Sequence, residues 1–256
     1  MIKSESRKSI IKKIEELSFD SWPALHTMQY DGWVLRFANG FTKRSNSVNP
    51  LYFSTLYLHE KIQYCERVYE KRGLETVFKM TPSPYPENLD EILECKGYLF
   101  DSETSVQVLK LEDLDIPPRR EAMLHRHLSQ EWLSHFCRLT DIPGKHQATL
   151  KKVLYNITPK ACFASLREKG ENHVISCGLG VLQDKYFGLY NVVTDENLRN
   201  RGYGRQLVLN LLNRAKNKRV ETVYLHVMVN NKPALKLYAG LGFKEVYRYW
   251  YRVKKG

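Results

Sequence analysis

Long apolar runs are missing from this 256-residue sequence. Its first 19 residues, MIKSESRKSIIKKIEELSF, instead alternate charged and apolar residues at helical spacing. A signal peptide or a membrane span needs an unbroken apolar stretch, which these residues never form. We therefore expect a cytoplasmic protein without a membrane partner.

Cysteine is scarce as well, and its five residues are scattered without a Cys-x-x-Cys pair. An odd count without close pairs suits reduced thiols better than a disulfide framework or a zinc site. His125, His127, His135 and His146 occupy predicted helical segments but lack the spacing of metal ligands. The sequence thus predicts no metal site and no catalytic cysteine.

Acidic residues are outnumbered, because 28 Asp and Glu stand against 40 Lys and Arg, a formal net charge of +12. Such a balance favours anionic partners, whether nucleotides, nucleic acid or acidic membrane, without selecting one of them. The excess is sharpest in residues 197–220, which hold seven basic residues and no acidic one. This segment is the first place to look for an anion site.

The second half of the chain switches between helical and strand periodicity, which predicts an α/β (α+β) fold with helices against one mixed, twisted sheet. We expect helices over residues 120–136, 144–156, 202–218 and 230–243, the last with an Asn N-cap and a Pro in its first turn. We expect strands over residues 161–170 and 173–184, joined by a turn near Gly170, and over residues 186–194, 222–229 and 244–253.

The first half repeats part of this order. Helices are expected over residues 57–73 and 87–98, and strands over residues 74–80 and 105–111. Two copies of one architecture are the economical interpretation. The junction is expected at DIPPRRE, with Pro117 and Pro118, giving domains 1–116 and 117–256, although strand 105–111 fits either half.

The segment NLRNRGYGRQLV, residues 197–208, joins a predicted strand to a predicted helix and contains Gly202 and Gly204. A helix start offers unpaired N–H groups and partial positive charge, and glycines let a phosphate approach the backbone. A dinucleotide fingerprint is excluded because Leu207 stands where a third small residue is needed, and the Gly-Lys-Ser/Thr of a nucleoside-triphosphatase loop is absent. An ordinary glycine turn that caps a surface helix stays open as the alternative.

Two motifs in the correct order carry a family resemblance. Arg199-x-x-Gly202-x-Gly204 resembles motif A of the GNAT superfamily of acetyl-CoA-dependent N-acetyltransferases. LHVMVNNKPALKLYAGLGF, residues 225–243, resembles motif B of the same superfamily. The resemblance covers residues 118–254 well, and the whole chain looks like bacterial tandem proteins whose first GNAT half is degenerate.

The resemblance implies a role for particular residues. It makes Tyr238 the general acid that protonates the departing thiolate. It places Asn231 near the pantetheine arm, to which Val192 and Val193 offer backbone groups. It assigns the pyrophosphate of coenzyme A to Arg199, Asn200, Arg201, Gly202, Tyr203, Gly204 and Arg205.

The resemblance also implies the reaction, a direct transfer of acetyl from acetyl-CoA to a primary amine of an unidentified acceptor. The amine must lose a proton, and no carboxylate is evident as the base. Asp195 and Glu196 are expected to cap the turn or to face solvent. His226 should point away from buried Leu225 and Val227 and is more often a plain polar strand residue.

The first half departs from the family pattern. No Arg-x-x-Gly-x-Gly precedes the helix near Leu58, and Leu93 or a neighbour stands where Tyr238 is expected, so one cofactor is predicted for two halves. NGFTKRSNSVNP, residues 39–50, is either a substrate-side or interdomain element or a basic turn. A rival function is a catalytically silent module that binds nucleic acid or protein, although the basic segment has few aromatics.

Overall fold

The structure is a computed structural model and describes residues 7–113, 120–168 and 173–254. Its contacts group the chain into two compact units. The N-terminal unit comprises residues 1–106, 228–230 and 246–256, and the C-terminal unit comprises residues 107–227 and 231–245. We expected one boundary after residue 116, whereas the contacts assign residues 107–113 to the C-terminal unit and the last strand to the N-terminal unit.

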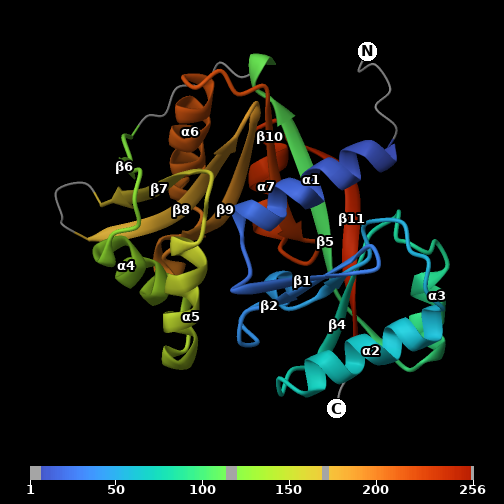
Figure 1. Ribbon diagram of the computed structural model, residues 1–256. Helices are drawn as coiled ribbons and strands as arrows, with labels where there is room; N and C mark the ends of the chain where they lie inside the picture. Colours follow the sequence, from blue (N-terminus) through green and yellow to red (C-terminus); the bar gives the residue numbers. More distant parts are fainter. Residues whose placement is uncertain (1–6, 114–119, 169–172, 255–256) are drawn as a thin grey trace. The chain divides into compact units, whose positions relative to one another are not determined.

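The N-terminal unit packs three helices against antiparallel and parallel strands (Figure 1). Its strand order is β1-β2-β3-β4-β11, in which only β3 and β4 pair in parallel. The core contains aromatic side chains, including Trp33, Tyr69, Phe78 and Tyr98. The helices and strands are α1 (Arg7–Ser21), β1 (His26–Tyr30), β2 (Trp33–Phe37), β3 (Val48–Asn49), α2 (Leu58–Glu70), β4 (Thr76–Met80), α3 (Leu89–Cys95), β5 (Leu99–Lys110) and β11 (Lys244–Lys254).

The C-terminal unit has the strand order β5-β10-β9-β8-β7-β6, with a parallel pair at β10 and β9 and antiparallel pairs from β9 to β6. β5 passes from one unit to the other after Val106, and β11 does so after Glu245. The remaining bounds are β6 (Met123–His125), α4 (Gln130–Thr140), α5 (Gly144–Tyr155), β7 (Lys160–Arg167), β8 (Val174–Gln183), β9 (Tyr186–Thr194), α6 (Tyr203–Lys216), β10 (Thr222–Met228) and α7 (Lys232–Ala239).

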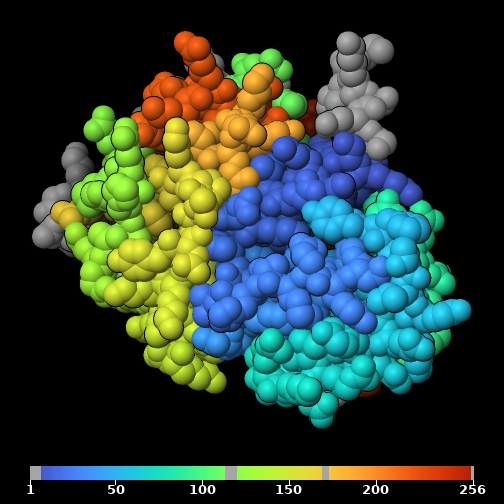
Figure 2. Space-filling view, in the orientation of Figure 1, coloured from blue at the N-terminus to red at the C-terminus, as the bar shows by residue number. Residues whose placement is uncertain are grey.

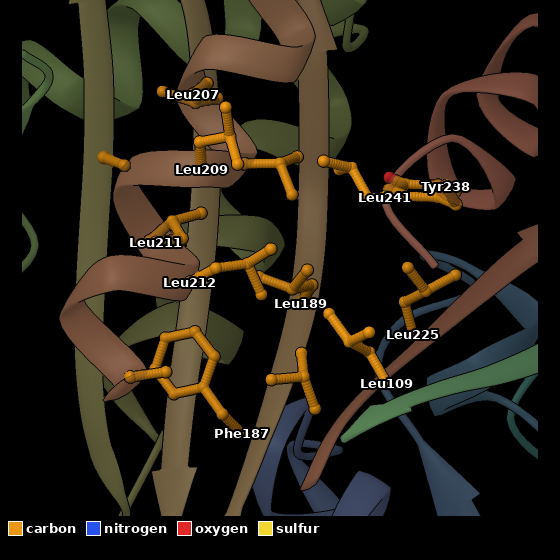
Figure 3. Close-up of a cluster of buried hydrophobic side chains, with 14 of the residues drawn as sticks. Leu109, Phe187, Leu189, Leu207, Leu209, Leu211, Leu212, Leu225, Tyr238 and Leu241 are labelled. Atoms are coloured by element: carbon orange, nitrogen blue, oxygen red, sulfur yellow. The ribbon is translucent and has the colours of Figure 1, made fainter. Parts of the chain in front are cut away.

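The apolar face predicted for α6 forms the centre of the C-terminal core. Leu207, Leu211 and Leu212 are fully buried and face Leu189 of β9 and Leu225 of β10 (Figure 3). Because burial of apolar surface stabilises by about 25 cal/mol per Å², this face fixes α6 against the sheet. The loop of residues 195–202 connects the end of β9 to the start of this anchored helix.

The prediction of a helix over residues 120–136 is wrong for the first half of that segment. Met123–His125 forms strand β6, which pairs with β7 at Met123↔Ser165, and the helix begins only at Gln130. Ser129 is its N-cap, and its hydroxyl accepts a hydrogen bond from Trp132 N–H at 3.0 Å. Met123, Leu124 and His125 each pair with a residue of β7, and the Ser129 cap decides the start of the helix.

The bounds of the other expected segments agree with the structure to within a few residues, except at the start of β5. That strand begins at Leu99 rather than at residue 105, because the polar run DSET continues the extended chain. The turn near Gly170 and both prolines of the expected junction lie outside the described residues.

Residues 39–50 are organised as a turn. The Asn46 carboxamide is buried; its oxygen accepts hydrogen bonds from Ala38 N–H and Gly40 N–H, and its nitrogen donates to Phe41 O at 2.8 Å. These bonds support the structural interpretation of this basic segment.

Candidate active site

The parallel pair β9 and β10 separates part of the way along its length. The strands pair from Tyr186↔Thr222 to Leu189↔Leu225. Beyond these residues β9 continues to Thr194 and β10 to Met228, without further pairing to each other among the described residues. The facing backbone groups of the separated ends are therefore available to an extended ligand.

A β-bulge in β9 accounts for this separation. Cys177 pairs with Val193 and Leu179 pairs with Tyr190, so β9 has one more residue than β8 between the two pairs. Asn191, inside the bulge, has a φ of 54°, a left-handed conformation that Asn tolerates better than most residues. Bulges bend a strand and increase its local twist, which turns the end of β9 away from β10.

Val192 and Val193, the predicted pantetheine contacts, are half-buried; Val192 lies in the bulge beside Asn191, and Val193 is the first paired residue after it. The Val193 carbonyl accepts a hydrogen bond from the Ser176 hydroxyl at 2.6 Å, which anchors this stretch to β8. The structure thus places both residues on the separated part of β9, where the prediction requires them.

The loop after β9 is held by Asp195. Its carboxylate accepts a hydrogen bond from Asn197 N–H at 3.1 Å and lies 3.3 Å from Arg138 Nη1. Burial alone would raise the pKa of Asp195, but these contacts outweigh it and lower the pKa. Asp195 is therefore an ionised cap, as expected, and not a free base; Glu196 is exposed.

Gly202 and Gly204 have different structural roles at the start of α6. Gly202 is the N-cap residue in the left-handed conformation, with a φ of 80°, and no side chain caps the helix. The first N–H groups of α6 consequently face the loop without an intrahelical partner. At Gly204 an added Cβ would lie 3.2 Å from Thr194 Oγ1 and 3.4 Å from Leu237 Cδ1, so this glycine permits close packing.

Positive charge surrounds this helix start. Arg199 and Arg201 are exposed and Arg205 is half-buried, and none of the three has an ion pair within the described residues. Arg120 adds a fourth cation that the motifs did not reveal, since its guanidinium lies 5.0 Å from the ring centroid of Tyr203. The helix dipole, the N–H groups without an intrahelical partner and these arginines are features that favour an anion at this position.

Arg120 is positioned by the helix itself. Asn210 on α6 donates to the Arg120 carbonyl at 2.7 Å and accepts from Ala122 N–H at 3.0 Å. No local motif identifies Arg120, because its position beside Tyr203 depends on its contact with Asn210, which is 90 residues away in the sequence.

Tyr238 projects from α7 into the core of the C-terminal unit, and it is only 8% exposed. Its ring meets Phe243 edge-on at 5.7 Å, and its hydroxyl points away from α7 toward the sheet (Figure 3). Burial raises the pKa of Tyr238 to about 12, so the phenol is neutral and able to donate a proton. Asn231 caps α7, with its side chain accepting from Ala234 N–H at 3.2 Å.

The opposite face of β9 and β10 carries a polar aromatic group. The Tyr190 hydroxyl donates to the Tyr224 hydroxyl at 3.1 Å, and the His226 ring lies 6.2 Å and 6.1 Å from those two rings. Leu225 and Val227 are buried on the other face, so His226 points as predicted. Sequence reasoning missed the two tyrosines, although their alternation with core residues was a usable signal.

In the N-terminal unit, the carboxylate of Asp31 lies at the start of α2, the position that corresponds to the start of α6. Asp31 accepts hydrogen bonds from the N–H groups of Thr55 and Leu56, at 3.0 and 2.9 Å, and binds Lys61 at 3.0 Å. Thr55 and Leu56 belong to the loop between β3 and α2, the counterpart in element order of the loop between β9 and α6, and Lys61 lies in the first turn of α2. A phosphate there would meet a negative charge. Leu93 is buried in the core and offers no acid.

No group of three His, Cys, Asp or Glu in the described part of the chain is arranged to hold a metal ion. Its five cysteines are free thiols. None of the helices over the same residues is both long enough and apolar enough to cross a bilayer.

A parallel strand pair that opens at its carboxyl end, followed by a glycine loop at a helix start, is the arrangement expected above from the resemblance to GNAT N-acetyltransferases. The chain belongs to the family described as "Probable histone acetyltransferase Rv0428c C-terminal", whose model matches residues 8–252. It is 28% identical over 250 residues to the uncharacterised N-acetyltransferase YobR of Bacillus subtilis (strain 168), covering 96% of this chain and 99% of that protein.

Solved structures support the same fold. A GCN5-related N-acetyltransferase from Kribbella flavida superposes with a TM-score of 0.71 at 13% identity, over 96% of each chain. A tandem GNAT protein from the clavulanic acid biosynthesis pathway gives a TM-score of 0.63 at 11% identity, over 95% of this chain and 88% of that one. The predicted fold of two GNAT-like halves is thereby confirmed, and the chain is an N-acetyltransferase.

Proposed function

We propose that the C-terminal unit binds acetyl-CoA and transfers the acetyl group directly to a primary amine. The observation that carries this proposal is the separation of β9 from β10, which leads into a glycine-capped helix start with unpaired arginines. The pyrophosphate would lie at residues 199–205, with Arg120 as an additional cation. The pantetheine arm would extend along Val192 and Val193.

The proposed chemistry uses the two faces of the separated strands. The amine nitrogen attacks the thioester carbon, a tetrahedral oxyanion forms, and the carbon–sulfur bond then breaks. The sulfur takes up the phenolic proton of Tyr238 as it departs, so a thiolate does not accumulate. The neutral state of Tyr238 and its position between α7 and the sheet support this role.

The amine must also reach the thioester without its proton. An alkylamine has a pKa near ~10.4, so the neutral form at pH 7 costs about 4 to 5 kcal/mol unless a base assists. We infer that His226 accepts this proton, because its ring lies beside Tyr190 and Tyr224 on the face opposite Tyr238. An imidazole is suited to proton uptake near neutral pH.

The test is acetyl-CoA binding by Gly202→Glu, measured by isothermal titration and by thermal shift. The new carboxylate would repel the pyrophosphate, so affinity should fall at least about 10²-fold, equivalent to about 2.7 kcal/mol. For the wild type, ligand at 100 times Kd should stabilise by about 2.7 kcal/mol. Gly73→Glu is the matched control, because Gly73 also has a positive φ and open space around it, in the other unit.

Failure of acetyl-CoA to stabilise the wild type would refute the enzymatic proposal and favour the silent binding module. Unchanged affinity in Gly202→Glu would refute the loop assignment alone. The acceptor can be sought by thiol release from acetyl-CoA with amines, amino acids, polyamines, aminoglycosides and peptides. Peptides with an amino-terminal alanine belong in this screen, because the chain is 34% identical over 70 residues to the ribosomal protein bS18-alanine N-acetyltransferase of Salmonella typhimurium. That match covers 27% of this chain and 47% of that protein.

A further inference from the structure

A cavity of about 540 Å³ lies in the C-terminal unit, away from the proposed cofactor loop. Phe187 at the start of β9 lines it, whereas the glycine loop follows Thr194 at the end of β9. At about 3.3 Å per residue, the seven steps from residue 187 to residue 194 span roughly 23 Å. Figure 3 likewise draws Phe187 at the opposite end of the core from Leu207, which lies in the first turns of α6. The cavity is therefore separate from the site proposed for acetyl-CoA.

The interior of this cavity is apolar. Leu154, Phe163, Leu182 and Phe187 supply side chains to its wall, from α5, β7, β8 and β9 respectively. Cys162 also lines it, and burial raises the pKa of this thiol, so that it stays uncharged. An apolar body would gain stability by leaving water for this space.

Positive charge is concentrated at the same cavity. Arg126, Lys160, Arg214 and Lys218 all line it, and no Asp or Glu does. Arg214 is half-buried, and none of the four cations has an ion pair within the described residues. Four unpaired cations around an apolar space create a strong attraction for an anionic group.

Basic residues near a helix end are common, because they interact favourably with the helix dipole. That explanation applies to Arg214 and Lys218 at the end of α6, a region that projects at the surface in Figure 2. It does not apply to Arg126, which precedes α4, or to Lys160, which opens β7. Their convergence on one cavity calls for a ligand.

We infer that this cavity binds a small amphipathic anion, with its apolar body against the leucine and phenylalanine side chains and its carboxylate or phosphate head among the four cations. The volume lies within the usual 300–1,000 Å³ of small-molecule sites. At about 30 Å³ for each water-sized group, it accommodates on the order of 10 to 20 non-hydrogen atoms. This is the size of a medium-chain carboxylate and not of coenzyme A.

The test is titration of the full chain with decanoate and with octyl phosphate, both in the presence of saturating acetyl-CoA so that the cofactor site is filled. Both probes should bind, and the stronger of the two identifies the preferred head group. Arg214→Gln and Arg126→Gln should each weaken binding roughly tenfold or more, because each removes a charged partner of the head group. Arg126 is exposed, so its variant keeps the test valid should Arg214→Gln fold poorly.

Lys216→Gln is the matched control, since this exposed lysine lies in the same last turn of α6 but does not line the cavity. Its affinity for decanoate should stay at the wild-type value. Decyltrimethylammonium, which has the same chain and the opposite charge, and acetate, which lacks the chain, should not bind. The proposal is overturned by equal binding of the cationic amphiphile, by no binding of either anionic probe, or by unchanged affinity in both arginine variants. Since acetyl-CoA binding is measured separately, its failure would not affect this result.

Discussion

At the scale of single residues, two side chains on opposite faces of one strand pair divide the proposed chemistry between them. Tyr238 is buried against Phe243, while His226 lies beside Tyr190 and Tyr224. Burial keeps the Tyr238 phenol neutral, and the His226 imidazole lies on the other face of the strand pair.

Tyr238→Phe should lower kcat by about 10²-fold, in the range typical of general-acid catalysis, while Kd for acetyl-CoA changes little. The phenylalanine preserves the edge contact with Phe243 and removes only the hydroxyl. Single-turnover kinetics and calorimetry separate the two effects. Tyr57→Phe, at an exposed position in the other unit, is the control. Full turnover in Tyr238→Phe would eliminate the acid role.

His226→Gln should lower kcat/KM by about 10²-fold at neutral pH. The deficit should shrink as pH rises, because the free amine becomes abundant near its own pKa of ~10.4 and no longer needs a base. A pH profile of kcat/KM measures this, with His125→Gln as a control on the exposed strand β6. A deficit that is constant at every pH would indicate a structural role instead.

At the scale of secondary structure, patterning predicted most segments but not the feature that opens the site. The apolar face of α6 and the bounds of β9 followed from periodicity, and both glycines followed from motif spacing. The bulge in β9 did not, since it depends on the register between β8 and β9. Its one sequence signal is Asn191, a residue tolerant of positive φ, among the β-branched and aromatic residues of YNVVT. Arg120 was hidden because only tertiary contacts bring it to Tyr203.

The Asp-Gly turn between β1 and β2 anchors the start of α2, and this anchor is sensitive to acid. Hydrogen bonds from Leu56, Thr55 and Lys61 outweigh the effect of burial and hold the pKa of Asp31 well below its usual range. Burial lowers the pKa of Lys61, an effect that its pair with Asp31 opposes. Loss of the carboxylate would therefore leave a buried ammonium group without its counter-charge, with the Asp31 carbonyl and the Ser54 hydroxyl as acceptors.

Asp31→Asn should destabilise the N-terminal unit by about 3 kcal/mol at pH 7. Because the folded pKa is below the unfolded value, the contribution of Asp31 is complete above about pH 5 and is lost as pH falls below about 4. The difference between wild type and variant should accordingly shrink in acid. Urea unfolding at pH 3 to 7 measures it, with Glu87→Gln in an exposed pair as the control. A difference that does not vary with pH would contradict this assignment.

At the scale of the whole molecule, the two units do not follow the order of the chain. The last strand pairs with the N-terminal unit, from Trp250↔Met80 to Lys254↔Thr76. Arg252 adds hydrogen bonds of 2.9 Å to Asp90, and its side chain is only 6% exposed. The N-terminal unit is therefore complete only when the strand residues from Val246 to Lys254 are present.

Termination of the chain after Glu245 should accelerate amide exchange in β4 and α3, although both lie more than 140 residues earlier in the sequence. The ladder to β4 and the ion pairs of Arg252 would be lost, which exposes a strand edge. Hydrogen exchange read by mass spectrometry measures this, with termination after Lys254 as the control. Exchange at the wild-type rate in β4 would contradict the grouping of the last strand with this unit.

The pairing of β11 with β4 also has a consequence for biosynthesis. A ribosome releases the N-terminal residues first, yet residues 246–254, which pair with β4, are made only after the C-terminal unit. Throughout synthesis of the C-terminal unit, β4 has an open edge of backbone donors and acceptors, the kind of edge that recruits other strands. The first unit to emerge is thus completed only after the second has been made, and the nascent chain depends on protection of that edge until β11 is available.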